Sequence, residues 1–218
     1  MSLIDDESSV DMIQEPPKVD RRRRPGRRVE ILQAVMSLLE KGNRRVTTAD
    51  LAVEVGLSEA ALYRHFTGKQ AIFQALAEYL RDHLLRPAGL ITDGGSPLLQ
   101  LRRLFEYHLR FFSEHPGLCR IFLMEEVVVT RSESKEMNKV LSEYSNQVKQ
   151  IMAAAQEAGE LPGDLDLGQA TNFLVGLIQS STLRFVISGF TAHPTGEASV
   201  LWTFFCRGVG LVEKTPAP

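Results

Sequence analysis

The residues best suited to chemistry are cations and hydroxyl groups near the N-terminus of the sequence. Arg21-Arg22-Arg23-Arg24 is followed, after Pro25-Gly26, by Arg27 and Arg28. Arginine, lysine, hydroxyl and imidazole groups all donate hydrogen bonds to phosphate oxygens, and arginine also pairs with guanine. Both this run and a second group of donors farther along therefore indicate contacts with nucleic acid. The second group is Ser58, Tyr63, Arg64, His65 and Lys69.

The charges are unevenly distributed along the chain. A formal net charge of −2 and an isoelectric point of about 6.2 argue, taken alone, against a nucleic-acid binder. Residues 1–17, however, have a net charge of −5, residues 18–86 of +6 and residues 87–218 of −3. Such asymmetry is typical of a basic module joined to a neutral-to-acidic one.

Several classes of protein do not fit the composition. A hydrophobic content of 44% with 24% charged residues is typical of a folded globular domain. Met1–Val10 is acidic where an export signal needs basic residues, and no uncharged apolar stretch reaches the roughly 18 to 20 residues that span a bilayer. Cys119 and Cys206 favour a reducing compartment over a disulfide framework. We therefore expect a soluble, cytoplasmic, nucleoid-associated protein without membrane contact.

Enzyme and metal motifs are missing from the sequence. There is no G-x-S-x-G elbow, no phosphate-binding G-x-x-x-x-G-K-[ST] loop, no H-E-x-x-H and no dinucleotide fingerprint. His108, His115 and Cys119 could suggest a metal site, but Pro116-Gly117 interrupts the helix between the last two and no fourth ligand follows at zinc-site spacing. We expect neither enzymatic activity nor a metal or cofactor.

Local signals predict three short helices in the basic block. Apolar residues at helical spacing predict a first helix over 27–39 that ends at Gly42-Asn43. Thr47 and Asp50 have the spacing of a capping box, which predicts a second helix running to about Val55.

A turn and a second cap follow. Gly56 suits the left-handed residue after a helix, and Ser58 can cap a third helix that extends to Phe66. Two short helices joined by a turn of three to four residues with glycine are typical of a helix-turn-helix.

The segment 46–69 closely resembles the DNA-binding domain of TetR-family transcriptional regulators. The resemblance is carried by Ala52, the turn Gly56-Leu57-Ser58, and Leu62-Tyr63-Arg64-His65-Phe66 with Lys69. It implies an all-α fold of about nine helices, with an N-terminal three-helix helix-turn-helix domain and a larger helical ligand-binding and dimerisation domain. We expect a disordered acidic tail (1–20), a basic arm with the DNA-binding domain (21–70) and a helical effector-binding and dimerisation domain (71–218).

Phosphate contacts follow from the resemblance. It implies that Tyr63, His65 and Lys69 bind phosphates, and that Thr47 or Thr48 does so from the second helix. The arginine arm is expected to lie along phosphates or to enter a minor groove.

Base readout is expected from the start of the third helix. Glu59 could accept a hydrogen bond from cytosine N4, Ala60 could touch a thymine methyl and Arg64 could approach guanine. The complete predicted DNA-binding set is Arg24, Arg27, Arg28, Arg45, Thr47, Thr48, Ser58, Glu59, Ala60, Tyr63, Arg64, His65 and Lys69.

The rest of the chain is predicted to be helical. Periodicity continues over 69–85, where Arg86-Pro87 predicts an end, and His115-Pro116-Gly117 predicts a break. The stretch 118–129 is apolar enough to be buried. Further helices are predicted over 97–114, 132–158, 167–188 and 197–212.

The last two predicted helices are apolar on more than one face, which favours pairing with a second copy in a two-fold four-helix bundle. Such a homodimer would match a palindromic DNA site. Packing within one subunit is the alternative. The predicted interface is Phe173, Leu177, Ser181, Val200, Leu201, Phe204 and Phe205.

A ligand pocket is a further hypothesis, since aromatic side chains recur in the middle helices, although such stripes more often form core. The candidates are Phe105, His108, Phe111, Phe112, Phe122, Phe173 and Trp202.

Two functions remain open from the sequence. The first is a dimeric DNA-binding regulator, a repressor released by a small apolar or amphipathic ligand. The second rests on His115-Pro116-Gly117-Leu118-Cys119-Arg120-Ile121 and on 58–66, which also look like nucleoid occlusion factors within the family. In that case DNA would activate the binding of a cell-division protein.

Overall fold

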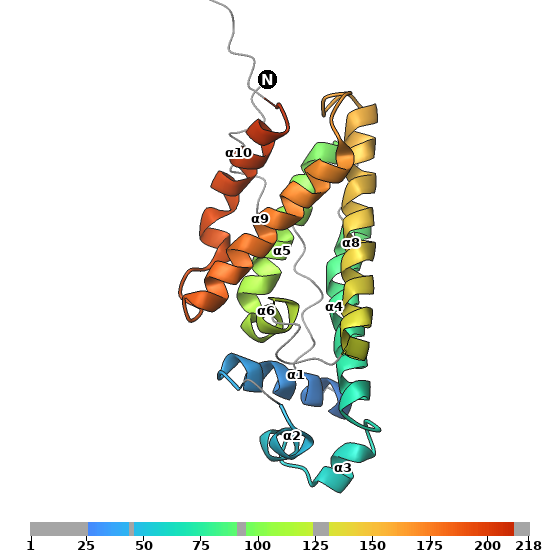
Figure 1. Ribbon diagram of the computed structural model, residues 1–218, viewed down its shortest axis with the longest axis vertical. Coiled ribbons are helices and arrows are strands. Elements are labelled where there is room, and N and C mark those ends of the chain that lie inside the picture. The colour runs from blue at the N-terminus through green and yellow to red at the C-terminus, as the bar shows by residue number, and fades with distance from the viewer. Residues whose placement is uncertain (1–25, 44–45, 91–94, 124–130, 212–218) are drawn as a thin grey trace, which may run out of the picture.

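A computed structural model of the protein describes residues 26–43, 46–90, 95–123 and 131–211. All regular structure within these ranges is helical, as predicted (Figure 1). The predicted tail (1–20), Arg24 and Arg45 lie outside the described residues. The helices are α1 (Arg27–Glu40), α2 (Thr48–Glu54), α3 (Glu59–Tyr63), α4 (Lys69–Leu90), α5 (Pro97–Glu114), α6 (Pro116–Leu123), α8 (Arg131–Glu157), α9 (Leu167–Ile187) and α10 (Ala198–Gly208), with the 3-10 helix η2 (Pro194–Glu197).

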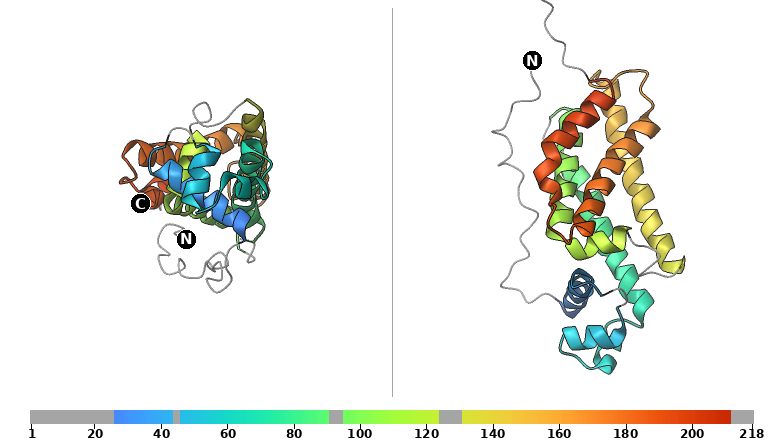
Figure 2. Two further views of the ribbon diagram at one scale, coloured as in Figure 1. Left: turned by 90° about the horizontal axis from the view of Figure 1, so that it is seen from below. Right: turned by 60° about the vertical axis from the view of Figure 1, so that its left-hand side comes forward.

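The molecule is elongated, with α1, α2 and α3 gathered at one end and the longer helices forming the rest (Figures 1 and 2). Helix α4 runs from this end unit into the body, where it packs along α8, and α9 packs against α5, α6 and α8. Ile31, Leu62 and Phe66 are buried in the end unit, and Phe105 and Phe205 are fully buried in the body. The end unit and the body thus each have buried apolar side chains of their own.

Helix α4 does not end before Pro87, which corrects the sequence prediction. The helix continues through this buried proline to Leu90. A proline lacks an N–H group and normally disturbs the preceding turn. Two side chains from other helices bond carbonyls in that turn: His108 Nε2 lies 3.2 Å from the carbonyl oxygen of Leu84, and Gln147 donates to that of Leu85 at 3.1 Å. Tertiary contacts therefore stabilise a turn that local propensity opposes.

Two other boundaries differ from the prediction. Helix α3 ends at Tyr63, three residues before the predicted end at Phe66. The break predicted at His115-Pro116-Gly117 is confirmed, since α5 ends at Glu114 and α6 begins at Pro116, where proline is well tolerated. The predicted helix over 197–212 is shorter in the structure, because η2 precedes it and α10 ends at Gly208. Gly210 follows with a φ of +82°, a left-handed conformation that ends the helical path.

Candidate nucleic-acid interface

The start of α2 is held by the predicted capping box. The Asp50 amide donates to Thr47 Oγ1 at 3.1 Å, and the Thr47 amide donates to Asp50 Oδ2 at 2.9 Å. The Thr47 hydroxyl donates to the same carboxylate at 2.7 Å, and these bonds lower the pKa of Asp50. Both donors of Thr47 are thus engaged. Because phosphate oxygens only accept hydrogen bonds, the predicted phosphate contact of Thr47 would compete with these capping bonds.

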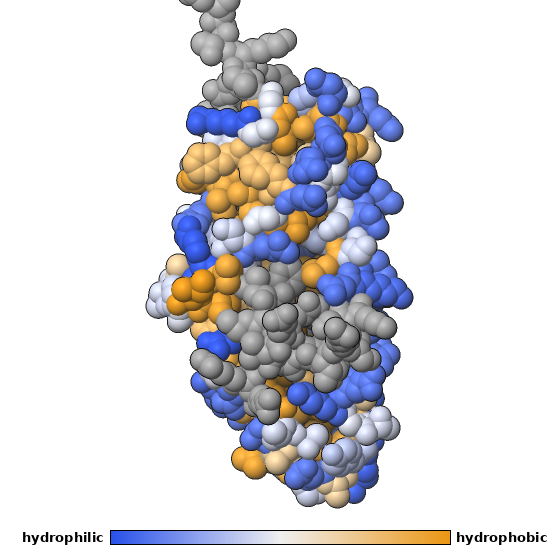
Figure 3. Space-filling model, in the orientation of Figure 1, coloured by the Kyte–Doolittle hydropathy of each residue, from blue (hydrophilic) through white to orange (hydrophobic). Residues whose placement is uncertain are grey.

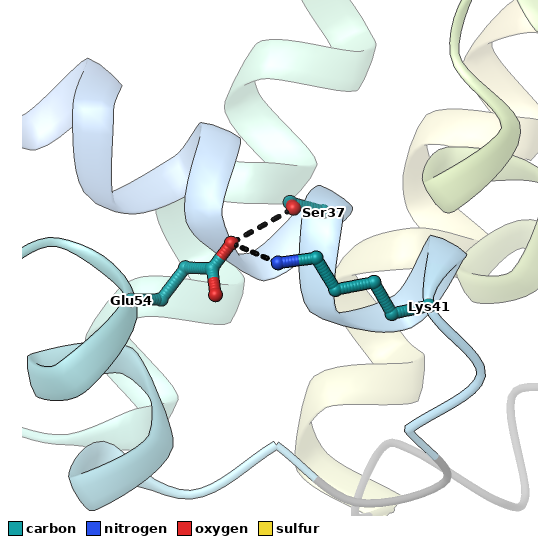
Figure 4. Close-up of polar contacts among 3 residues, drawn as sticks. All are labelled: Ser37, Lys41 and Glu54. Carbon is teal, nitrogen blue, oxygen red and sulfur yellow. Dashed lines mark hydrogen bonds and ion pairs between the residues drawn. The ribbon is translucent and has the colours of Figure 1, made fainter.

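Helix α2 is also braced against α1 by its last residue (Figure 4). Glu54 Oε1 accepts from Ser37 Oγ at 2.9 Å and pairs with Lys41 Nζ at 2.6 Å. Lys41, and then Ser37, lower the pKa of the Glu54 carboxyl. Sequence reasoning missed this three-residue contact, although Ser37 and Lys41 are four residues apart and so share one face of α1.

The turn and α3 expose a short polar surface. Gly56 has a φ of +65°, and Ser58 caps α3 by accepting from the Ala61 amide at 3.1 Å, both as predicted. The Ser58 hydroxyl hydrogen is not used in this cap and can donate elsewhere. Leu62 is buried, whereas exposed residues face outward: Ser58, Glu59, Ala60, Tyr63 and Arg64.

Thr48 and Glu59 connect α2 to α3. Each is the first residue of its helix, and the Thr48 hydroxyl donates to Glu59 Oε2 at 3.0 Å. Two residues that the sequence places separately in the DNA-binding set therefore form one hydrogen-bonded pair.

Arg28 contacts the protein itself. It donates to the carbonyl oxygen of His65 at 3.0 Å, and its guanidinium lies 4.3 Å from the ring centroid of Phe66. Arg27 pairs with Glu30 of the same helix at 2.6 Å. The end of α3 is thus tied to the start of α1, and the predicted phosphate contact of Arg28 would compete with this tie.

His65 and Lys69 flank the turn into α4. Both are half-buried, and Lys69 Nζ lies 5.3 Å from the ring centroid of Phe73. Together with Tyr63 and Arg64, these residues bring the C-terminal part of the predicted DNA-binding set to one end of the molecule (Figure 1).

The predicted pocket residues do not share one environment. Phe105 and Phe112 are fully buried, and Trp202 packs on Phe105 with ring centroids 5.9 Å apart. Phe173, by contrast, is 40% exposed. The side chain of Phe122 lies outside the described residues.

Phe111 contacts Phe112, with ring centroids 5.4 Å apart, and also joins a cluster with two histidines. Its ring lies 4.5 Å from that of His115 and 5.3 Å from that of His83. A pocket of about 220 Å³ lies close by, at the junction of α1 with α4 and α6, and none of the predicted pocket residues line it. Its walls are Gln33, Met36, Ser37, Glu40, Tyr79, Glu114, His115, Pro116 and Gly117.

His108 is a neutral structural residue. Since a carbonyl oxygen only accepts, Nε2 must carry the proton donated to Leu84, which leaves Nδ1 to accept from the Tyr144 hydroxyl at 3.0 Å. Burial lowers the pKa of His108 to about 4. The side chain links α4, α5 and α8.

The outer faces of α9 and α10 carry exposed apolar side chains (Figure 3). Phe173, Val200 and Phe204 of the predicted interface are 40%, 53% and 54% exposed. Leu183 and Ile187, which the prediction omits, are also exposed. Leu177 and Leu201 are half-buried. Ser181 and Phe205 are buried in the subunit, so the prediction that they form a surface is corrected. Periodicity could not separate them, because both helices are apolar on more than one face.

Known protein families match the chain in two separate segments. Residues 31–76 match the family described as "Bacterial regulatory proteins, tetR family", and residues 94–189 match the "Tetracyclin repressor-like, C-terminal domain". The protein belongs to the TetR family of regulators. This regulator is 35% identical over 186 residues to the nucleoid occlusion factor SlmA of Aliivibrio fischeri, with 83% of its own chain and 94% of the relative covered. It is 31% identical over 194 residues to SlmA of Photobacterium profundum, with 86% and 98% covered.

Solved structures share the fold of this TetR-family protein at low sequence identity. The fatty acid degradation regulator FadR from Bacillus halodurans superposes with a TM-score of 0.77 at 14% identity, covering 86% of this chain and 98% of that one. FadR from Bacillus subtilis in complex with stearoyl-CoA gives 0.73 at 16% identity, covering 85% and 99%. The protein is thus a DNA-binding transcriptional regulator, in a family of regulators that bind DNA as dimers and often bind small molecules.

Within the ranges that the structure describes, no helix is both long and apolar enough to cross a bilayer. The same residues contain no group of three or more histidine, cysteine or acidic side chains arranged to hold a metal ion.

Proposed function

We propose that this TetR-family regulator binds a palindromic double-stranded operator as a homodimer and represses transcription from it. The observation that carries the proposal is the exposed surface of α3, where Ser58, Tyr63 and Arg64 offer hydrogen-bond donors beside the small Ala60. A capped helix of this kind, second in a helix-turn-helix, suits docking in a major groove. In this proposal 21–70 binds DNA.

The proposed homodimer forms through α9 and α10. One helix-turn-helix reads too few base pairs for useful specificity, so two copies are needed. The exposed rings of Phe173 and Phe204 and the exposed Val200 support this surface, because apolar patches on soluble proteins commonly mark association sites.

A small apolar or amphipathic effector would release the repressor. Support comes from the fold shared with the FadR structure that contains stearoyl-CoA. If such a molecule favours one spacing of the two DNA-binding units, linkage requires that DNA weakens its binding to the same extent. The effector-binding part would lie within 71–218.

A nucleoid-occlusion role is the second candidate. It is favoured by the SlmA relatives, which match over almost their whole length. The tight packing of Phe105 and Trp202, two of the predicted pocket residues, also favours it, since a protein partner needs no internal cavity. In this role DNA would promote the binding of a cell-division protein.

Salt titration tests the DNA-binding mode. A palindrome selected from random DNA should bind two copies, and log affinity should fall with log salt by about 0.9 for each phosphate neutralised. An affinity independent of salt would refute the proposed phosphate contacts.

Genome-wide occupancy separates the two candidate roles. One or two promoter sites indicate a local repressor, whereas many dispersed sites indicate nucleoid occlusion. A melting temperature raised by stearoyl-CoA, together with weakened operator binding, would support the effector; unchanged values of both would count against stearoyl-CoA in that role.

A further inference from the structure

Thr48 and Glu59 form an unusual pair at the DNA-binding end of the molecule. The pair joins the first residues of α2 and α3 through one hydrogen bond of 3.0 Å. Glu59 is exposed, and none of the cations in the described residues forms a salt bridge with it. A carboxylate is therefore displayed in the part of the chain that otherwise carries a net positive charge.

The Thr48–Glu59 pair offers only hydrogen-bond acceptors to a bound molecule. A threonine hydroxyl has a single hydrogen, and in Thr48 it is used to hold Glu59. What remains are the lone pairs of Thr48 Oγ1 and of the carboxylate. Phosphate oxygens also only accept and carry negative charge, so this pair would be repelled by the DNA backbone. The expectation that Thr48 binds a phosphate does not fit this arrangement.

Only two groups in the major groove can satisfy such acceptors: the amino groups of cytosine N4 and adenine N6. Adenine presents its N7 acceptor next to N6, and this lone pair would face the carboxylate. Cytosine presents a C–H group next to N4, which does not repel it. The electrostatics therefore favour cytosine.

Neighbouring side chains are compatible with a close approach. The exposed Ala60 follows Glu59 and is too short to hold the helix away from the bases, while Ser58 and Arg64 carry the donors that phosphates or guanine need. We propose that Glu59, positioned by Thr48, selects cytosine at one position of each DNA half-site. The inference rests on the proposed docking of α3 in the major groove.

The experiment compares base preference with affinity in the full-length protein. A site is selected from random DNA with the wild type, and dissociation constants are measured for every single-base change in one half-site. Wild type should bind DNA with cytosine at one position roughly 5- to 150-fold more tightly than DNA with the other bases there. In Glu59→Gln the preference at this position should move to adenine, because an amide can pair with both N6 and N7.

Variants of Thr48 test the positioning role. Thr48→Val keeps the branched shape but removes the hydroxyl, and it should reduce the cytosine preference while binding to non-specific DNA is retained. Thr48→Ser should restore it. Glu78→Gln, which removes an exposed carboxylate from α4, is the matched control and should leave all base preferences unchanged.

The possible outcomes are distinct. An unaltered base preference in Glu59→Gln would overturn the inference. A uniform loss of affinity in Thr48→Val for all sequences, with a smaller salt dependence, would also overturn it and would identify Thr48 as a phosphate contact. Failure of the wild type to bind any selected DNA would instead refute the proposed function.

Discussion

Gly117 of α6 lies directly against the backbone of Met36 in α1. A β-carbon at Gly117 would lie 2.8 Å from Met36 Cα and closer still to the Met36 carbonyl. Real β-carbons do not approach backbone so closely. The end unit and the body of the molecule therefore meet at a point where only glycine fits.

Gly117→Ala should consequently destabilise the contact between α1 and α6. We expect a loss of about 1–3 kcal/mol, typical of an overpacked site, and a lower melting temperature by calorimetry. Gly163→Ala is the control, since a β-carbon there has open space around it. A melting temperature of Gly117→Ala equal to that of wild type would contradict the inferred close packing.

His108 predicts a pH dependence of stability. Burial lowers its pKa from 6.5 to about 4, so between these values the unfolded chain binds a proton that the folded chain does not. Stability should be complete above pH 6.5 and fall by roughly 3 kcal/mol as the pH drops to 4. Urea unfolding at several pH values measures this. His108→Gln can keep both hydrogen bonds without titrating, and its slope in this window should be smaller; an equal slope would assign the effect to other groups.

Glu54 should also make the stability of the fold depend on pH, more weakly than His108 does and at lower pH. Its pKa is lowered from 4.5, so its contribution is present above 4.5 and lost as the pH falls through the lowered value. At pH 7, Glu54→Gln should lower the melting temperature by an amount on the order of 1 °C, because the pair is exposed to solvent. The difference from wild type should disappear in acid. A difference that persists at pH 3 would show that charge is not its cause.

Phe204 tests the homodimer. Placing a charge at this exposed apolar position, in Phe204→Glu, should shift the dimer toward monomer at micromolar concentration and weaken operator binding at least tenfold, since the paired half-sites would no longer be engaged together. Analytical ultracentrifugation and DNA titration measure the two effects. Gln150→Glu adds the same charge at an exposed position of α8 and should leave both unchanged. If Phe204→Glu remains dimeric, the interface lies elsewhere.

The sequence by itself determined the local architecture of the DNA-binding end. The capping box of Thr47 and Asp50, the left-handed Gly56 and the Ser58 cap all form as predicted. Each depends on residues no more than three positions apart, so composition and spacing suffice to predict them.

Contacts between residues far apart in the sequence, and the burial of individual side chains, depend on the tertiary structure. Helix α4 passes through Pro87, and His108 and Gln147, from other helices, bond the carbonyls of Leu84 and Leu85 beside it. The partner that Thr48 holds is eleven residues away, across the turn. Adjacent Phe204 and Phe205 differ completely in exposure, although both are apolar in the sequence. Where a helix is apolar on more than one face, the packing of neighbouring helices decides which face is buried and which polar groups meet, and periodicity along that helix does not determine it.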